Sequence, residues 1–307
     1  IPNSDIPGST TGDSWTAVAS SADGSKLAAV TNSGGGSGYI YTSTNFGATW
    51  TERAAAGYKY WSSIASSADG TKLVATCGSD YLYASNDSGV TWAPISSAGI
   101  KSWSAVASSA DGTKLVATDA SGLGSSLYTS TDSGATWTER IGSGSARWRA
   151  VASSADGTKL VAVTYGGYIY NSADSGATWT TRTAAGSRVW SSVASSADGT
   201  KLKAVVGGSV AGYIYTSVDS GATWTARTAA GSRRWQAISS SSDGAKAIAF
   251  YPSGIFTTVD SGATWVAQTS PASNWRGSAS SADGTNLVGL NYNGHIYTST
   301  DSGVSWV

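Results

Sequence analysis

All the tryptophans of this chain fall into two series that repeat along its length. The first series is spaced by 40 to 46 residues and the second by 41 to 45. The first comprises Trp15, Trp61, Trp103, Trp148, Trp190, Trp235 and Trp275, and the second Trp50, Trp92, Trp137, Trp179, Trp224, Trp265 and Trp306. Such periods are typical of repeat architectures, in which each unit packs on its neighbours. The sequence therefore predicts one domain, 1–307, of seven units starting near the first-series tryptophans.

Two turn signals recur in step with the tryptophans. One is Ala-Asp-Gly, with Ser in place of Ala once, centred on Asp23, Asp69, Asp111, Asp156, Asp198, Asp243 and Asp283. The other is Ser-x-Asp-x-Gly-x-Thr-Trp, which ends each unit at a second-series tryptophan. Because Asp and Gly favour tight turns, both signals punctuate strands.

Each unit reads as four short strands and no helix. In the fourth unit we expect strands at 148–153, 159–163, 168–171 and 178–182, separated by turns at 155–157, 166–167 and 174–176. Apolar and polar residues alternate with a period of two, as in a half-buried strand. Four antiparallel strands in each of seven units predict an all-β fold, a seven-bladed β-propeller.

Ring closure would remove the free sheet edges of such a chain, because every blade packs on two neighbours. The seventh unit stops at Val307, early in its fourth strand. We therefore expect the two ends to meet, with Ile1–Pro7 near the shortened last strand.

The Ser-x-Asp-x-Gly-x-Thr-Trp pattern resembles the Asp box, or bacterial neuraminidase repeat, of sialidase-like propellers. Its acidic position is occupied by Asn45, Asp87, Asp132, Asp174, Asp219, Asp260 and Asp301. Among the deviations, the first copy has Asn45-Phe46 and the sixth begins with Thr258. The resemblance implies a structural turn between the third and fourth strands, away from the active face. One carboxylate per turn falls short of the six to eight oxygens around calcium, so we expect no metal and no cofactor.

The resemblance to sialidases raises the question of catalysis. Sialidases use a Tyr with a Glu, an Asp acid/base and three Arg, and the family's Arg-Ile-Pro motif has no match in this chain. Glu52 and Glu139, the two glutamates, occupy the same repeat position on the fourth strand, which indicates a solvated face. Asp80 and Asp119 are expected in the loops between the second and third strands of adjacent units. They are the single carboxyl pair that a glycoside hydrolase could use, as Asp-box xyloglucan hydrolases use paired Asp. We expect a non-enzymatic protein.

The two faces of a propeller differ in how much the units vary. The Ala-Asp-Gly turns and Asp boxes share one face, and the sequence repeats closely there. The loops between second and third strands, and the connectors between units, share the other face, where the length changes fall. Variable loops on a rigid scaffold are where binding sites are normally found.

The connectors place a Lys or Arg within two residues of a Trp in six units. Around one mouth of the channel they would form a ring suited to sugars or anionic groups. The binding candidates are Lys59, Tyr60, Trp61, Lys101, Trp103, Arg147, Trp148, Arg188, Trp190, Arg233, Arg234, Trp235, Asn274, Trp275 and Arg276. Recurrence in every unit favours a packing role for the Trp residues. The cations are the better guide to binding, because no acidic residue recurs beside them, and they predict a basic loop face opposite an acidic turn face.

Three functions fit this pattern. The first is recognition of a glycan or another anionic or polyhydroxylated surface through the loop face. The alternative is a protein-interaction or assembly scaffold, since the chain also resembles the Asp-box-like propellers that help assemble photosystem II. The third is the glycoside hydrolase considered above, and a consensus repeat without a ligand is also compatible with the near-identity of the units.

Composition excludes other classes. The chain has 19 basic and 19 acidic residues, so it has no electrostatic footprint for nucleic acid. No run of 18 apolar residues is present, so we expect no membrane span. Ser/Thr-rich strands, no Met and a single Cys lead us to expect an extracellular or otherwise exported protein.

Overall fold

The computed structural model describes residues 13–33, 36–121, 125–140, 146–292 and 294–307. Within these ranges the chain consists of β-strands, loops and three 3-10 turns, with no α-helix. The 3-10 turns are η1 (Ala54–Ala56), η2 (Ser96–Ala98) and η4 (Thr228–Ala230). The prediction of an all-β fold is confirmed.

The strands form successive antiparallel meanders, and consecutive strands within a meander pair with each other. The first strands are β1 (Asp13–Ser20), β5 (Trp61–Ser66), β9 (Lys101–Ser108), β13 (Trp148–Ser153), β17 (Arg188–Ser195), β21 (Ala237–Ser240) and β25 (Trp275–Ser280). The second strands are β2 (Leu27–Ser33), β6 (Leu73–Asp80), β10 (Leu115–Asp119), β14 (Leu160–Gly167), β18 (Leu202–Val206), β22 (Ala247–Tyr251) and β26 (Leu287–Asn291).

The third strands have four or five residues and the fourth strands two or three. The third strands are β3 (Ile40–Ser43), β7 (Leu82–Ser85), β11 (Leu127–Ser130), β15 (Ile169–Ser172), β19 (Ile214–Ser217), β23 (Gly254–Thr258) and β27 (Ile296–Ser299). The fourth strands are β4 (Thr51–Glu52), β8 (Ala93–Ile95), β12 (Thr138–Arg140), β16 (Thr180–Arg182), β20 (Thr225–Arg227) and β24 (Val266–Gln268). In the last meander, Val307 exchanges two backbone hydrogen bonds of 3.0 Å with Thr298 of β27.

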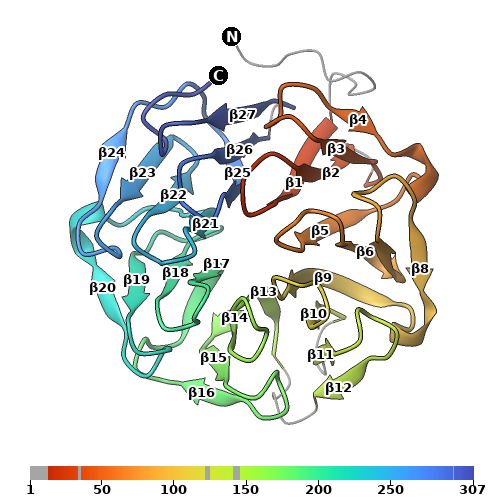
Figure 1. The fold of residues 1–307 in the computed structure, drawn as a ribbon. Coiled ribbons are helices and arrows are strands. Elements are labelled where there is room, and N and C mark those ends of the chain that lie inside the picture. The colour runs from red at the N-terminus through yellow and green to blue at the C-terminus, as the bar shows by residue number, and fades with distance from the viewer. Residues whose placement is uncertain (1–12, 34–35, 122–124, 141–145, 293) are drawn as a thin grey trace.

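The meanders are arranged in a ring, with the first strands around the centre and the fourth strands at the periphery (Figure 1). A closed cycle of backbone hydrogen bonds, each 2.6–2.7 Å long, links the residue before each Ala-Asp-Gly aspartate to its counterpart in the next meander. The cycle runs from Ala22 to Ala68, Ala110, Ala155, Ala197, Ser242, Ala282 and back to Ala22. The first and last meanders are therefore neighbours, as expected. The expectation for Ile1–Pro7 lies outside the described residues.

Aspartate side chains hold both kinds of turn. In the third meander, Asp132 accepts hydrogen bonds from the Thr136 backbone N–H (2.9 Å) and hydroxyl (2.6 Å). Ser133 and Gly134 both have positive φ, 59° and 89°, so the turn needs two left-handed residues in succession. The serine is strained there more than the glycine, and the Asp132 bonds offset that strain.

The second strands extend further toward the connectors than we expected. A turn was predicted at Gly166-Gly167, but β14 continues through Gly167, which pairs with Arg188 of the next meander. Likewise Asp80 ends β6 and pairs with Lys101, although a loop was expected there. The added pairings join neighbouring meanders and stiffen this end of the ring.

Candidate binding surface on the connector face

The connector face is the side of the ring formed by the links between meanders and the loops between their second and third strands. The opposite side, with the Ala-Asp-Gly and Ser-x-Asp-x-Gly-x-Thr-Trp turns, is the Asp-turn face. The two names are used in this sense below.

The seven connector tryptophans lie between adjacent meanders and are buried, with exposed fractions of 0–3%. Trp148, for example, packs among Val116 and Leu127 of one meander and Val151 of the next. Each also meets a Tyr or Phe of the third strand at 4.9–5.6 Å between ring centroids. Their faces are enclosed by protein, which matches the packing role weighed above and leaves no face for a ligand.

The connector cations stack on tyrosines instead. The charged group lies 4.6–5.3 Å from the ring centroid, within cation–π range. The pairs are Lys59–Tyr83, Lys101–Tyr128, Arg147–Tyr165, Arg188–Tyr215, Arg233–Tyr251 and Arg276–Tyr292. The sequence does not pair these residues, because each tyrosine lies 16 or more positions after its cation, although a Tyr recurs on several third strands.

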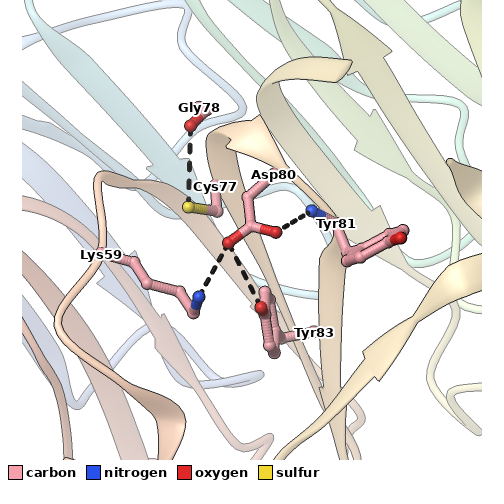
Figure 2. A network of polar contacts seen from close by, with 6 residues as sticks. All are labelled: Lys59, Cys77, Gly78, Asp80, Tyr81 and Tyr83. Carbon is pink, nitrogen blue, oxygen red and sulfur yellow. Dashed lines mark hydrogen bonds and ion pairs between the residues drawn. The ribbon is translucent and has the colours of Figure 1, made fainter. Parts of the chain in front are cut away.

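One cation has an acidic partner, contrary to the expectation that none would be neutralised. Lys59 Nζ donates to Asp80 Oδ2 at 2.8 Å, and Asp80 also accepts from the Tyr83 hydroxyl and the Tyr81 backbone N–H (Figure 2). Burial would raise the pKa of Asp80, but these bonds, led by Lys59, hold it below its usual range. The connector between the first and second meanders, which contains Lys59, therefore contributes little net positive charge.

The carboxyl pair considered for hydrolysis is already engaged in other contacts. Asp80 has a lowered pKa, whereas a general acid needs a raised one. Asp119, which ends β10 rather than lying in a loop, is 7% exposed and accepts hydrogen bonds from the backbone and hydroxyl of Ser121. Both carboxylates stabilise the ends of their strands.

A cleft of about 690 Å³ opens on the connector face over the fourth to seventh meanders. Its polar lining includes Arg149, Gln236, Asn274 and Arg276, and its aromatic lining includes Tyr165 and Tyr292. Among the predicted candidates Trp190, Asn274, Trp275 and Arg276 line this cleft. Arg147 and Trp148 line a smaller one of about 360 Å³ beside it. Lys59, Tyr60, Trp61, Lys101, Trp103, Arg188, Arg233, Arg234 and Trp235 line neither.

The position after each connector tryptophan breaks the repeat. It is occupied by Thr16, Ser62, Ser104, Arg149, Ser191, Gln236 and Arg276 in chain order. The three long side chains line both the cleft and the central channel, so they lie at the mouth between them. Arg149 and Gln236 were not among the predicted candidates. The signal that identifies them is the departure from Ser/Thr at a repeated position.

Charge is divided unequally between the two faces. Among the side chains that the structure describes, the connector face carries eight Lys and Arg against Asp80 and Asp119, whereas thirteen turn aspartates and six lysines lie on the Asp-turn face. Across the described residues the ion pair found is Lys59–Asp80, so Arg149 and Arg276 have no carboxylate partner there. The cleft therefore has a positive potential that attracts anionic groups.

The described residues bring no three His, Cys, Asp or Glu side chains together as a metal site. They contain no helix long and apolar enough to cross a membrane. The chemistry that the connector face can perform with its own residues is hydrogen bonding, charge pairing and stacking.

No protein-family model matches the sequence, and a comparison with curated proteins finds no relative. Solved structures are similar in fold. A structure described as YCF48 bound to D1 peptide has a TM-score of 0.72 at 14% identity, covering 94% of each chain. YCF48 from Cyanidioschyzon merolae has a TM-score of 0.69 at 16% identity, covering 96% of this chain and 97% of that one. An ancestral GH74 enzyme has a TM-score of 0.71 at 14% identity, covering 97% of this chain and 47% of that one.

At these identities the likeness shows the fold alone, an antiparallel β-propeller, since one fold serves many functions. The predicted propeller architecture is thereby supported at the level of fold class.

Proposed function

We propose that this chain is a non-catalytic seven-bladed β-propeller that binds an acidic segment of a partner protein in the connector-face cleft. The observation that carries the proposal is the cleft of about 690 Å³ with Arg149 and Arg276 at its mouth and no carboxylate paired to either among the described residues. Guanidinium groups bind carboxylates through two parallel hydrogen bonds, which gives both affinity and orientation.

The blade count rests on the meanders and the closed hydrogen-bond cycle. Each meander contributes one residue to the seven-membered cycle from Ala22 to Ala282, so each is one blade. The recurrent turns held by aspartate, such as that of Asp132, support their assignment as Asp boxes.

A peptide suits the cleft better than a compact ion does. The cleft spans four meanders, and Tyr165 and Tyr292 beside it are 41% and 48% exposed, so they can cover apolar side chains of a bound segment. The solved structure with a D1 peptide shares the propeller fold, which makes peptide binding a known use of this architecture.

The test is binding of a fluorescent acidic peptide, compared with a neutral peptide of the same length, followed by fluorescence anisotropy at increasing salt. Arg149→Gln with Arg276→Gln is expected to weaken binding of the acidic peptide by about tenfold or more, because two charge-assisted contacts are lost. Lys114→Gln with Lys246→Gln removes two charges from the Asp-turn face and is the matched control. Equal binding of both peptides, or an equal loss in the control, contradicts the proposal.

Glycan recognition is a second candidate, and exposed aromatic side chains favour it. Tyr58 and Tyr60 are 56% and 49% exposed, and sugars stack on such rings. An array of neutral and sulfated oligosaccharides, probed with the wild type and with Tyr60→Ala, separates the two candidates. Saturable sugar binding that Tyr60→Ala abolishes, together with no peptide binding, would favour the glycan.

The absence of catalysis is part of the proposal, and so is an exported location. The absence of catalysis is supported by the ion pair of Asp80 with Lys59 and by the burial of Asp119. Release of reducing sugar from xyloglucan, abolished by Asp80→Asn, would contradict it.

A further inference from the structure

A hydrogen bond between the third and fourth strands recurs around the ring. In four meanders a long side chain on the fourth strand, or directly after it, donates to a threonine hydroxyl on the third strand at 2.7–2.8 Å. The pairs are Arg53–Thr42, Arg140–Thr129, Arg227–Thr216 and Gln268–Thr257. The fourth meander has Asn171 and Arg182 at these two positions, and the bond is missing there.

Asn171 is turned away from Arg182 toward the next meander. Its Nδ2 donates to the Ser220 carbonyl at 3.1 Å, which settles the orientation of the amide, because a carbonyl oxygen accepts from the NH₂ group only. Oδ1 of Asn171 and Nε of Arg182 are both buried without a hydrogen-bond partner. Asn171 is 7% exposed, so leaving its oxygen unpaired is costly.

Both unpaired atoms belong to side chains that line a cavity of about 230 Å³ between the fourth and fifth meanders. At roughly 30 Å³ per molecule this is the volume of about seven waters. The corresponding place between the last and first meanders, where Thr298 stands in the position of Asn171, encloses about 10 Å³. The larger cavity thus coincides with the meander in which long polar side chains stand at both positions without forming the repeated bond.

The two unpaired atoms define the chemistry of an occupant. It must accept a hydrogen bond from Arg182 and donate one to Asn171, which a hydroxyl group can do and a simple anion cannot. Lys159 is also in the lining, its Nζ donating to the Asp198 carbonyl at 2.9 Å, and no carboxylate is among the lining residues. We infer that the cavity between the fourth and fifth meanders is a binding site for a small polyhydroxylated molecule, a monosaccharide or polyol.

This site is independent of the proposed function. Its lining comes from the Asp-turn ends of β14, β15, β17 and β18 and from β16 at the periphery. The connector-face cleft lies at the other end of the same strands. Loss of one activity therefore leaves the other measurable.

The test is a titration of ¹⁵N-labelled protein with glucose, xylose and glycerol, following the Arg182 Nε–H and Asn171 Nδ2–H₂ resonances. A parallel titration with sulfate tests whether the cavity binds a simple anion instead. Arg182→Gln and Asn171→Thr assign the two signals. We expect saturable shifts with at least one of the hydroxyl compounds at millimolar concentration.

Asn171→Thr is the decisive variant, because it introduces the threonine that four other meanders use for this bond and so gives Arg182 Nε–H an acceptor. It is expected to weaken the sugar response by about tenfold or more without lowering the melting temperature. Thr129→Ser, which keeps the bond in the third meander, is the matched control and should leave the response unchanged. The inference is overturned by no shift up to about 100 mM sugar, which means water alone fills the cavity. A response retained in Asn171→Thr, or a shift with sulfate alone, overturns it as well.

Discussion

The two faces of the ring are built from the same seven units and differ in what the repeats preserve. On the Asp-turn face each turn aspartate accepts from a hydroxyl two residues before it and from a backbone N–H two or four residues after it, as Asp69 and Asp132 do. A closed cycle of backbone bonds links all the meanders. On the connector face the position after the tryptophan changes from Ser or Thr to Arg149, Gln236 and Arg276. The first face shows what the ring needs for closure, and the second shows where it can vary without opening.

The largest effect on the free energy of unfolding should come from the connector tryptophans, which pack between adjacent meanders. Trp103 is 1% exposed and packs against Tyr128 of its own meander and residues of the preceding one. Trp103→Ala is expected to cost about 3–5 kcal/mol, because it removes a large buried ring and leaves a cavity between meanders. Urea denaturation measures it, with exposed Tyr58→Ala as control. A loss of less than about 1 kcal/mol would mean that the tryptophan does not hold the meanders together.

Lys203 also differs from its counterparts in the other units, but it lies in the interior of the fold and not on either face. It is 1% exposed where other second strands have Val74, Val116 or Val161, and it donates to Ser240 and to the Gly244 carbonyl. Burial lowers its pKa to about 8. Its charged form is therefore disfavoured in the folded state.

Lys203→Met is expected to stabilise the protein by about 2–3 kcal/mol at pH 7, because the unfolded chain holds its proton more tightly. With a folded pKa of about 8 and an unfolded value near 10.5, the wild type gains stability as the pH rises through that window. Urea denaturation at pH 7, 9 and 10.5 should show the difference between the two proteins shrinking. A constant difference would mean that Lys203 is not the cause.

Acid should act on the Asp-turn face first. Hydrogen bonds from the neighbouring hydroxyls and backbone N–H groups lower the pKa of the turn aspartates, and they lower those of Asp69 and Asp174 to about 2. Since the folded pKa lies below the unfolded one, these groups stabilise the fold above about pH 4, and the contribution is lost as the pH falls toward 2. Each exposed group contributes little, but the repetition adds up. The melting temperature should fall between pH 4 and 2, and less steeply in Asp69→Asn; a flat profile contradicts this.

The fold was largely predictable because closure demands repetition. Trp103, Asp132 and Gly134 have counterparts in the other units, so periodicity alone located the strands and turns. The cation–π partners were missed because Lys101 and Tyr128 are joined only when the meander forms. Arg149, Gln236 and Asn171 are detected in the opposite way, because each differs from the residues at the same position of other units. Only the structure shows that Arg149 and Gln236 line a cleft and that Asn171 lines a cavity.

The smallest expected changes in the free energy of unfolding test most directly whether the two faces differ in their contribution to stability. On the Asp-turn face Lys72 Nζ donates to the Asp111 carbonyl at 3.0 Å and so links two meanders. Lys72→Gln should cost about 0.5–1 kcal/mol. Arg149 at the cleft mouth is exposed and has no ion pair in the described part of the chain, so Arg149→Gln should change the free energy of unfolding by less than about 0.5 kcal/mol. Both substitutions remove one positive charge, so their effects on net charge cancel in the comparison. If Arg149→Gln destabilises as much as Lys72→Gln, the cleft arginine is a structural link like the lysine, and its position outside the repeat no longer indicates binding.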